Sequence, residues 1–372
     1  MAVLYASIFA FAGILMPFMP VWLAAKGLDA REVGLVLASA MVARPIIVPV
    51  ATRIADRFGW AKGPLVISAW LACMSFFAVA LSDGFVAILI AYANSALPQA
   101  VVLPLTDAYA LRGLAERGLA YGPVRLWGSV TFIAANLGGG FFLQRLGALD
   151  IVWVLIAALI ATAIAASLQT PVASLRTEER DTTHSGPSLW RSRRFVAVVI
   201  AAGLIQASHA VYYGFASLQW AAKGWDGTTI GALWAIGVIA EIALFAASGR
   251  FLSRLGPFDL LAIGAAGGVL RWCAMAFDPP TLLVPALQCL HALTFGAAHL
   301  GAMHALGHFA VQHRGATAQG DYSAVVATMS AAAMGFSGVL VETFGSHAYL
   351  AMGLLAALAG AIIVAAGRDA LG

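Results

Sequence analysis

Charge is scarce in this sequence. Only 10% of its 372 residues are Asp, Glu, Lys or Arg, whereas 62% are hydrophobic and the mean hydropathy is +0.90. A soluble domain carries about 25% charged residues, so the composition excludes an ordinary soluble enzyme. The formal charge of +4 is therefore no argument for a nucleic-acid partner, and its distribution between loops matters more than its size.

Cysteine is scarce as well. The three cysteines, Cys73, Cys273 and Cys289, lie inside apolar runs, and three cannot form a closed set of disulfides. The sequence also lacks a P-loop and a nucleophile-elbow pattern. We therefore expect no enzyme activity, no step driven by ATP on this chain and no cofactor.

Long apolar runs dominate what is present. About 20 apolar residues suffice to cross a bilayer as a helix, and these runs do not alternate as the strands of a β-barrel would. The first run has no positive segment before it, so we expect a membrane helix and not a cleaved signal. The twelve runs that fit the sequence cover roughly residues 2–25, 32–54, 63–82, 84–110, 123–144, 149–169, 195–219, 228–250, 257–277, 281–306, 317–341 and 346–367.

One connection is much longer than the others. Residues 170–194 are charged, rich in Ser and Thr and contain Gly-Pro, which is typical of a solvated linker. The linker separates an N-terminal bundle, residues 1–169, from a C-terminal bundle, residues 195–372. We predict an all-α membrane protein with twelve transmembrane helices in two pseudo-symmetric six-helix bundles.

Lys and Arg are distributed unevenly between the predicted loops. If the N-terminus is cytoplasmic, the inner loops and C-terminus hold 14, the outer loops hold 4, and 3 lie within spans, which accounts for all 21. Cytoplasmic loops of membrane proteins carry such an excess. We therefore predict a multi-pass protein of the bacterial inner membrane with both termini in the cytoplasm.

The chain repeats itself with a shift of 197 residues. Ala24-Ala25-Lys26-Gly27-x-Asp29 falls on Ala221-Ala222-Lys223-Gly224-x-Asp226, and Gly34 falls on Gly231. Two parallel six-helix halves with this kinship describe the major facilitator architecture, in which the site lies between the halves at mid-membrane.

The same shift aligns two loop motifs, Asp56-Arg57-x-Gly59 and Ser253-Arg254-x-Gly256. They resemble the major facilitator signature G-x-x-x-D-R-x-G, although Thr52 replaces the leading Gly of the first copy and Ser253 replaces the Asp of the second. An ordinary tight basic loop is the alternative. The resemblance implies a latch for the inner gate, formed by Asp56, Arg57, Gly59, Arg254 and Gly256.

Four ionisable residues lie deep inside predicted spans. At ~1.5 Å per residue, Arg44 and Glu241 lie ~18 Å deep in spans two and eight. Arg271 lies ~21 Å from the inner face and His291 ~15 Å from the outer face. Charge at that depth is costly and is usually functional. We expect these side chains to share a polar cavity with Glu241 beside Arg271; a static structural ion pair is the alternative.

Two further charges flank the hairpin between spans four and five. Asp107 lies near the end of one run, and Arg125 follows 18 residues later near the start of the next. We expect the hairpin to bring the carboxylate and the guanidinium together at the inner edge of the hydrocarbon.

The segments around these charges resemble the lactose permease and phenylpropionate permease branch of the major facilitators, over essentially the full length. Tyr121-Gly-Pro-Val-Arg-Leu-Trp-Gly-Ser129 and Pro104-Leu-Thr-Asp-Ala108 are similar to its spans five and four. The segments similar to spans seven, eight and nine of the phenylpropionate branch are Ser208-His-Ala-Val-Tyr-Tyr-Gly-Phe215, Gly237-Val-Ile-Ala-Glu241 and Val269-Leu-Arg-Trp272.

The sequence departs from lactose permease at two functional positions. Thr294 stands where that permease has its proton-carrying glutamate, and Phe132 stands where it has a sugar-stacking tryptophan. The first departure leaves Glu241, His291, His299 or Asp321 as proton carriers. The second favours an aromatic or less polar ligand over a galactoside.

Histidines gather in span ten. His291 and His299 could form a proton relay, because imidazole titrates near working pH; packing is the alternative. His304 and His308 have the spacing of a metal pair, but no Cys or carboxylate lies nearby in the sequence, so we predict no metal site.

These observations predict a secondary transporter that couples uptake of a small organic solute to protons by alternating access. The resemblance favours an aromatic carboxylate such as 3-phenylpropionate. We expect a monomer in a lipid bilayer, with the proton as coupling ion. The expected substrate-binding residues are Asp107, Arg125, Arg44, Phe132, His209, Tyr212, Tyr213 and Arg271, and those for proton coupling are Glu241, His291, His299 and Asp321.

Other functions stay open at this point. A proton-coupled sugar or nucleoside symporter is the second candidate, and an exporter of hydrophobic compounds is the third. A membrane receptor or assembly factor that transports nothing would not need titratable groups at mid-membrane, so the buried charges argue against it.

Overall fold

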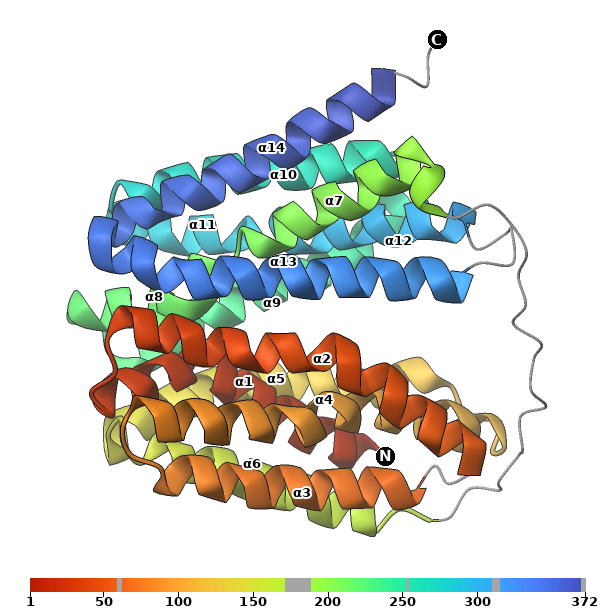
Figure 1. The fold of residues 1–372 in the computed structure, drawn as a ribbon, viewed down its shortest axis with the longest axis vertical. Helices are drawn as coiled ribbons and strands as arrows, with labels where there is room; N and C mark the ends of the chain where they lie inside the picture. Colours follow the sequence, from red (N-terminus) through yellow and green to blue (C-terminus); the bar gives the residue numbers. More distant parts are fainter. Residues whose placement is uncertain (59–61, 171–188, 252–253, 310–314, 369–372) are drawn as a thin grey trace. The chain divides into compact units, whose positions relative to one another are not determined.

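The computed structural model describes residues 1–58, 62–170, 189–251, 254–309 and 315–368. Helices account for most of these residues (Figure 1). They are α1 (Ala2–Ala25), α2 (Ala30–Phe58), α3 (Lys62–Leu81), α4 (Phe85–Ala115), α5 (Tyr121–Leu146), α6 (Ile151–Ser167), α7 (Arg193–Ala207), α8 (Ala210–Ala222), α9 (Gly227–Phe251), α10 (Pro257–Ala276), α11 (Val284–Cys289), α12 (Ala298–Phe309), α13 (Gly315–Phe344) and α14 (Tyr349–Arg368).

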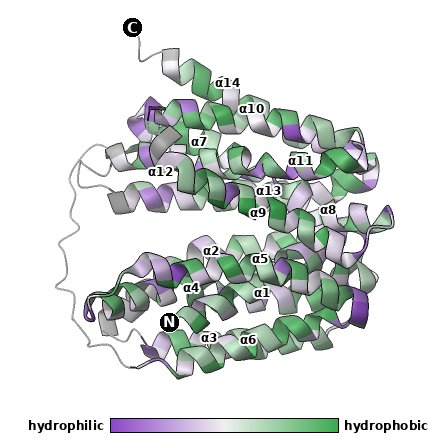
Figure 2. Ribbon diagram, turned by 180° about the vertical axis from the view of Figure 1, so that it is seen from behind, coloured by the Kyte–Doolittle hydropathy of each residue, from purple (hydrophilic) through white to green (hydrophobic). Residues whose placement is uncertain are grey.

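The apolar runs of the sequence become these helices. Nine helical stretches within the described ranges are long and apolar enough to cross a membrane, and α6 is a shorter apolar helix. Hydrophobic residues follow the helices and hydrophilic ones gather at their ends (Figure 2). A helix satisfies its own backbone hydrogen bonds, which lipid cannot do. The predicted all-α membrane architecture is confirmed.

Two predicted spans are interrupted. Span seven is divided into α7 and α8 by a turn at Ser208 and His209. Span ten consists of α11, a π-helix at Ala292–Ala297, and α12. Short π-helical segments are rare and are frequent at functional sites. Apolar length alone did not predict either interruption.

The 197-residue repeat is preserved in backbone geometry. The N–H of Gly27 donates to Ala24 O at 2.9 Å, and the N–H of Gly224 donates to Ala221 O at 2.9 Å. Both glycines have a positive φ, of 87° and 83°, where a side chain would be strained. After each glycine an aspartate caps the next helix, since the N–H of Glu32 donates to Asp29 Oδ1 and that of Thr229 to Asp226 Oδ1.

The chain forms two compact units. The first unit comprises Met1–Asp181 and Ser217–Ala235, and the second comprises Thr182–Ala216 and Ile236–Gly372. The end of α8 and the start of α9 group with the first unit, whereas we predicted both within the C-terminal bundle. Residues 171–188 of the predicted linker lie outside the described residues.

Close helix packing in the first unit positions α1 against the start of α5. A Cβ on Gly13 would lie 2.7 Å from the backbone oxygen of Phe132, and one on Gly139 would lie 2.8 Å from Cε2 of Phe18. Glycine at these positions therefore allows the two helices to approach closely. This approach brings the first turns of α1 beside the residues that follow Tyr121.

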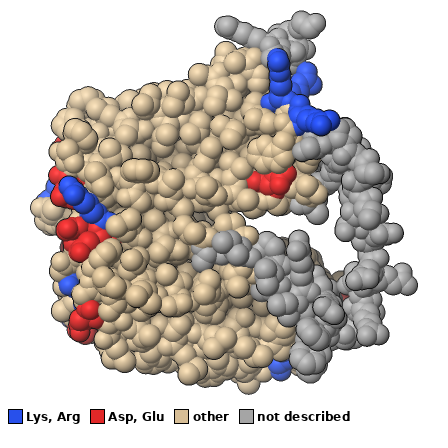
Figure 3. All heavy atoms as spheres, in the orientation of Figure 1, with Lys and Arg blue, Asp and Glu red and all other residues tan. Residues whose placement is uncertain are grey.

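The second unit has its own core, built where α7, α10, α12, α13 and α14 meet. Its members include Phe195, Ile205, Leu261, Ala302 and Tyr322, all of them buried. On the face shown in Figure 3, the charged side chains of each unit lie towards the helix ends and leave uncharged flanks between them. A lipid-facing surface requires this distribution, because exposed charge in hydrocarbon is costly.

One copy of the predicted gating loop is described. In the second copy, the N–H of Gly256 donates to Asp259 Oδ2 at 2.9 Å, and this hydrogen bond caps the start of α10. Arg254 is exposed in the preceding turn. The first copy, with Asp56, Arg57 and Gly59, lies outside the residues whose side chains are described.

Candidate functional site

Tyr5 lies at the centre of a polar cluster in the first unit. Its hydroxyl donates a hydrogen bond to Asp107 Oδ1 at 2.6 Å, and the hydroxyl of Tyr121 donates to the same oxygen at 2.9 Å. Tyr5 is completely buried and Asp107 is half-buried. Two phenols therefore hold the predicted functional carboxylate, which accepts hydrogen bonds when ionised.

Arg125 lies on aromatic rings of α1. Its Cζ is 4.1 Å from the ring centroid of Phe9 and 5.4 Å from that of Tyr5, distances at which the faces of aromatic rings attract a cation. Between these described side chains, Asp107 and Arg125 form no direct ion pair. Tyr5 connects the two side chains instead. Its hydroxyl donates to the carboxylate of Asp107, and its ring contacts the guanidinium of Arg125.

The N–H groups of Arg125 donate no hydrogen bond to another described residue. A Cβ on Gly128 would lie 2.8 Å from Cδ2 of Phe9 and 2.9 Å from Nη1 of Arg125. The absence of a side chain at Gly128 therefore leaves room for the guanidinium to lie over Phe9 with its donors free.

Phe132 joins this cluster through its edge-on contact with Phe9, with ring centroids 6.5 Å apart. Tyr5, Phe9 and Tyr121 were not predicted as site residues. Tyr5 and Phe9 are four residues apart and so share one face of α1, but nothing in the sequence pairs that face with α5. We call Tyr5, Phe9, Asp107, Tyr121, Arg125 and Phe132 the Tyr5 cluster.

In the second unit, Arg271 is completely buried. Its Nη2 donates to Gln288 Oε1 at 2.7 Å. Its Nη1 donates to Thr294 Oγ1 at 3.3 Å and to His291 Nδ1 at 3.2 Å, while Nε has no partner among the described residues. The neighbours of this buried cation are thus mostly neutral hydrogen-bond acceptors.

Aromatic rings supply the rest of its surroundings. The Cζ of Arg271 lies 4.5 Å from the ring centroid of Tyr212 and 4.6 Å from that of Trp272. Trp272 is itself held by a stacking contact with Tyr349 at 5.8 Å and by a hydrogen bond from its Nε1 to Ser208 Oγ at 3.0 Å. Ring faces stabilise a desolvated cation, which offsets part of the cost of burying Arg271.

His291 connects Arg271 with Glu241. Its Nε2 lies 3.7 Å from Glu241 Oε2, and the side chains are 10% and 17% exposed. No direct ion pair joins Glu241 and Arg271 within the part of the chain that the structure describes. The expected neighbours are therefore separated by one imidazole, which contacts the cation on one nitrogen and the carboxylate on the other.

His209 extends the network to α7. Its Nδ1 lies 3.0 Å from Ile205 O and its Nε2 lies 3.0 Å from Thr294 Oγ1. A carbonyl only accepts, so Nδ1 of neutral His209 donates and Nε2 accepts from the hydroxyl of Thr294. That hydroxyl in turn accepts from Arg271. Thr294, which stands where lactose permease has a glutamate, therefore links His209 to Arg271 in a polar chain.

Some of the remaining predicted residues contact this network and others do not. Ring stacking links His291 to Phe295 at 5.3 Å and Phe295 to His299 at 6.0 Å, so His299 continues the line along span ten. Tyr213 stacks on His209 at 5.4 Å. Asp321, on α13, makes no hydrogen bond or ion pair with another described residue. The side chain of Arg44 lies outside the described residues.

The structure adds members that we did not predict. Gln288 and Tyr349 belong to this group, and Gln288 had a usable signal, because it precedes His291 by three residues and shares its helix face. We call the group the Arg271 cluster. It comprises His209, Tyr212, Tyr213, Glu241, Arg271, Trp272, Gln288, His291, Thr294 and Tyr349.

Both clusters combine ionisable groups, hydrogen-bonding groups and aromatic surface inside helices that are long enough to cross a bilayer. Such residues mark the paths of solutes and ions through membrane proteins. Fold and clusters together define a membrane transporter.

The chain belongs to the MFS_1 like family, whose model matches residues 1–351, and it is a secondary transporter of the major facilitator superfamily. It is 32% identical over 364 residues to the "Probable 3-phenylpropionic acid transporter" of Escherichia coli, covering 95% of this chain and 93% of that one. It is 26% identical to the "Maltose permease" of Geobacillus stearothermophilus over 322 residues, 86% of this chain and 82% of that one.

Solved structures show the same fold. A crystal structure of a mutant of the nucleoside transporter NupG superposes with a TM-score of 0.86 at 16% identity and covers 98% of each chain. A bacterial homologue of the human lysosomal transporter Spinster superposes with a TM-score of 0.75 at 14% identity, covering 99% of this chain and 95% of that one. The curated relatives are named as a transporter and a permease, and with the family match they show that this chain is a transporter and not an enzyme.

Proposed function

We propose that this protein is a proton-coupled symporter that takes up a small aromatic carboxylate, such as 3-phenylpropionate, across a bacterial inner membrane. The observation that carries the proposal is Arg125, which lies on the rings of Phe9 and Tyr5 with no N–H donated to another described residue. A cation with open donors beside aromatic surface fits a ligand that has a carboxylate and a phenyl ring.

In the substrate site, Arg125 would bind the carboxylate of the ligand. A guanidinium binds a carboxylate through two parallel N–H bonds, and Phe9 fixes the plane of that fork from below. Phe132, in edge contact with Phe9, would pack against the apolar body of the ligand. Asp107 would remain hydrogen-bonded to Tyr5 and Tyr121, so that its carboxylate does not compete with the substrate carboxylate for Arg125.

Proton coupling would use the Arg271 cluster. Glu241 lies at the end of a chain that runs through His291 to the buried Arg271. A proton on Glu241 would change the charge that His291 and Arg271 face, and the chain would transmit this change to α10 and to span ten. Arg271 and Arg44, which the sequence places deep in spans nine and two, would add positive potential for an anion. His299 and Asp321 are the other candidate carriers.

Alternating access would follow the general scheme of the superfamily, in which two bundles rock about a site between them. The charge distribution of the loops favours cytoplasmic termini, and we propose a monomer as the transporting unit. The gating residues would be Arg254 and Gly256, with Asp56, Arg57 and Gly59 in the first copy of the loop.

A sugar or nucleoside symporter is the second candidate. It is favoured by the identity with a maltose permease, while the likeness to a nucleoside transporter structure concerns the fold alone. An exporter of hydrophobic compounds is the third. Neither alternative needs an arginine with open donors on an aromatic ring, which is why we rank the aromatic carboxylate first.

The test is uptake by the purified chain in proteoliposomes. An inward pH gradient should drive accumulation of radiolabelled 3-phenylpropionate, and a protonophore should abolish it. Maltose and uridine should not compete. Glu241→Gln should abolish accumulation while leaving exchange of substrate across the membrane, whereas the exposed carboxylate variant Glu342→Gln should behave as wild type. Accumulation of the sugar or the nucleoside, but of no aromatic acid, would refute the proposed substrate.

A further inference from the structure

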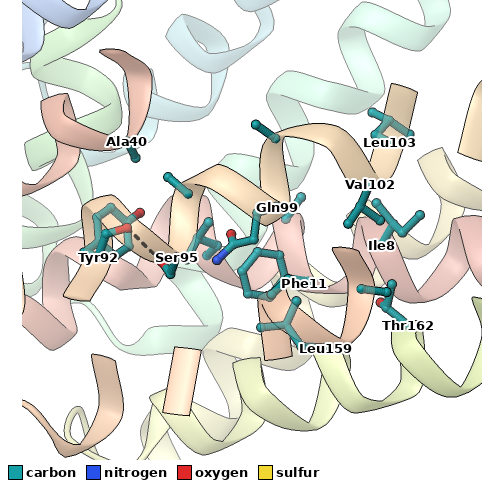
Figure 4. Close-up of a pocket in the computed structure, with 16 residues that line it drawn as sticks. Ile8, Phe11, Ala40, Tyr92, Ser95, Gln99, Val102, Leu103, Leu159 and Thr162 are labelled. Carbon is teal, nitrogen blue, oxygen red and sulfur yellow. Dashed lines mark hydrogen bonds between the residues drawn. The ribbon is translucent and has the colours of Figure 1, made fainter. Parts of the chain in front are cut away.

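The first unit contains a cavity that the Tyr5 cluster does not use. Its volume is about 230 Å³, and it lies where α1, α3, α4 and α6 meet, with Ala40 of α2 at one side (Figure 4). An apolar cavity of about 150 Å³ is enough to hold benzene. The space in this unit is therefore large enough for a ligand with one or two rings.

The cavity opens on a different face of α1 from the Tyr5 cluster. Its α1 residues are Ile8, Phe11, Ala12 and Leu15, whereas Tyr5 and Phe9 turn towards Tyr121, Arg125 and Phe132 of α5. At 3.6 residues per turn, the cavity residues of α1 are offset around the helix from Tyr5 and Phe9 by about a quarter of a turn. The two sites therefore lie on adjoining faces of one helix.

Aromatic rings line the cavity, and no charged side chain lines it among the residues whose side chains the structure describes. The ring of Phe11 meets that of Phe76 edge-on at 5.4 Å, and Phe76 lies 6.5 Å from Tyr92. Small side chains, Ala72 and Ala96 among them, leave the space between the helices. An ionised ligand would find no counter-charge among these described side chains, so they favour uncharged aromatic molecules.

Polar groups in the cavity are few, and most have partners. The hydroxyl of Ser95 donates to Tyr92 O at 2.8 Å, and that of Thr162 donates to Ala158 O at 2.9 Å. In contrast, Nε2 of Gln99 is buried and has no partner among the described residues. Figure 4 shows the Gln99 side chain between Ser95 and Phe11. A buried donor without a partner is rare in proteins and favours a ligand that supplies an acceptor.

We propose that this cavity is a second binding site, separate from the Tyr5 cluster, for an uncharged aromatic molecule that carries a carbonyl or similar hydrogen-bond acceptor. The ring would pack between Phe11 and Tyr92. The acceptor would take the N–H of Gln99. Ala72 and Ala96 would face the ring, because any larger side chain there would occupy the same space.

Benzophenone is a suitable probe, because it has two rings, one carbonyl acceptor and no charge, and on irradiation it reacts with nearby C–H bonds. The purified full chain in lipid nanodiscs would be irradiated with benzophenone, digested and mapped by mass spectrometry. We expect saturable labelling of peptides from α1 and α4 that line the cavity. Acetophenone, a smaller carbonyl compound, should compete.

Two variants test the assignment. Ala72→Phe fills the cavity and should reduce the saturable labelling about tenfold, whereas Ala78→Phe, on the exposed side of the same helix, should not. Gln99→Met keeps the volume but removes the donor and should weaken binding about fivefold, the equivalent of one ordinary hydrogen bond. Asn94→Leu, exposed on the same helix, is its control. Folding is checked by the elution profile and melting temperature of each variant.

The outcomes separate this site from the proposed function. Arg125→Ala should abolish binding of 3-phenylpropionate and leave benzophenone labelling of the cavity unchanged. Labelling that does not saturate, or that is equal in folded Ala72→Phe and wild type, would show partition into lipid and overturn the proposal. Loss of labelling in folded Arg125→Ala would show a single shared site and would also overturn it.

Discussion

Nη1 of Arg271 lies 3.2 Å from Nδ1 of His291, and this contact determines which nitrogen of neutral His291 carries the proton. A guanidinium has only donors, so Nδ1 must accept and the proton must sit on Nε2. That nitrogen is the one that faces Glu241. Arg271 thus fixes the tautomer of His291 in which the Nε2–H group faces Glu241, the proposed proton carrier. The imidazole therefore connects the buried cation with the carboxylate.

Replacing His291 should separate its two contacts. In His291→Asn the amide oxygen can take the place of Nδ1 and accept from Arg271, but no group reaches Glu241. We expect proton-driven accumulation to be lost and the melting temperature to stay near that of wild type. His291→Leu, which removes both contacts, should also lower the free energy of unfolding by about 1–3 kcal/mol.

Accumulation in proteoliposomes and thermal unfolding are the two measurements, and His304→Asn, exposed on the same span, is the control. Full accumulation by His291→Asn would show that the imidazole does not connect Glu241 with Arg271 during transport.

Thr294 should matter for stability more than a threonine usually does. Its hydroxyl accepts from Arg271 and pairs with Nε2 of His209, so Thr294→Val leaves two buried groups short of a partner. We expect a loss of about 2–4 kcal/mol, roughly 1–2 for each group. Denaturation of the purified protein would measure it. Thr328→Val, exposed and bonded only within its own helix, should change stability by less than about 0.5 kcal/mol, and equal effects would contradict the network.

Arg125→Lys should lose substrate affinity even though it keeps the charge. A lysine ammonium cannot lie flat on Phe9 or offer two parallel donors to a carboxylate. We expect the apparent affinity for 3-phenylpropionate to fall at least about tenfold, or about 1.4 kcal/mol. Arg145→Lys is the matched control, since Arg145 also lies over a phenylalanine of α5, at 5.3 Å from Phe141, but near the helix end. Unchanged affinity in Arg125→Lys would show that charge alone binds the anion.

The close approach of α1 and α5 predicts a large effect of one methyl group. In Gly13→Ala the new Cβ would lie 2.7 Å from Phe132 O and 2.9 Å from the Cβ of Ala135, so the helices must separate. We expect a loss of about 1–3 kcal/mol of stability together with weaker substrate binding, because Phe9 moves away from Arg125. Gly122→Ala, where a Cβ meets nothing within 4 Å, should be neutral or slightly stabilising.

Stability and binding of 3-phenylpropionate would be measured on both glycine variants. If Gly13→Ala lowered stability and left affinity intact, the packing of α1 on α5 would not be what positions the anion site.

The sequence predicted the helices well because apolar length is a local property. A run such as residues 2–25 must be helical in lipid whatever its neighbours, and α1 spans those same residues. The repeat was equally legible, since Lys26-Gly27 and Lys223-Gly224 form the same turn with the same cap. The turn at Ser208 and the π-helix at Ala292–Ala297 were not predicted, because tertiary hydrogen bonds from Trp272 and to His209 stabilise those backbone departures.

The sequence did not predict which side chains inside the membrane contact each other. Depth along a span can be counted from the sequence, and it predicted similar depths for Glu241, Arg271 and His291, which the structure brings into one cluster. It could not show that His291 lies between the other two, because rotation about the helix axis and side-chain direction are set by packing. The same limit applies to Asp107 and Arg125, which are joined by Tyr5, a residue 102 positions before Asp107.

The sequence by itself determined that this chain is a two-part helical membrane transporter, because burying charges and apolar runs in lipid leaves few other solutions. Only the tertiary structure decided that Arg125 lies over Phe9 with no N–H donated to another described residue, and that the described neighbours of Arg271 are mostly neutral acceptors and aromatic rings. Both arrangements depend on which helix faces pack together. Packing between segments that are distant in the sequence is determined by the shapes of many side chains, and no local sequence pattern predicts it.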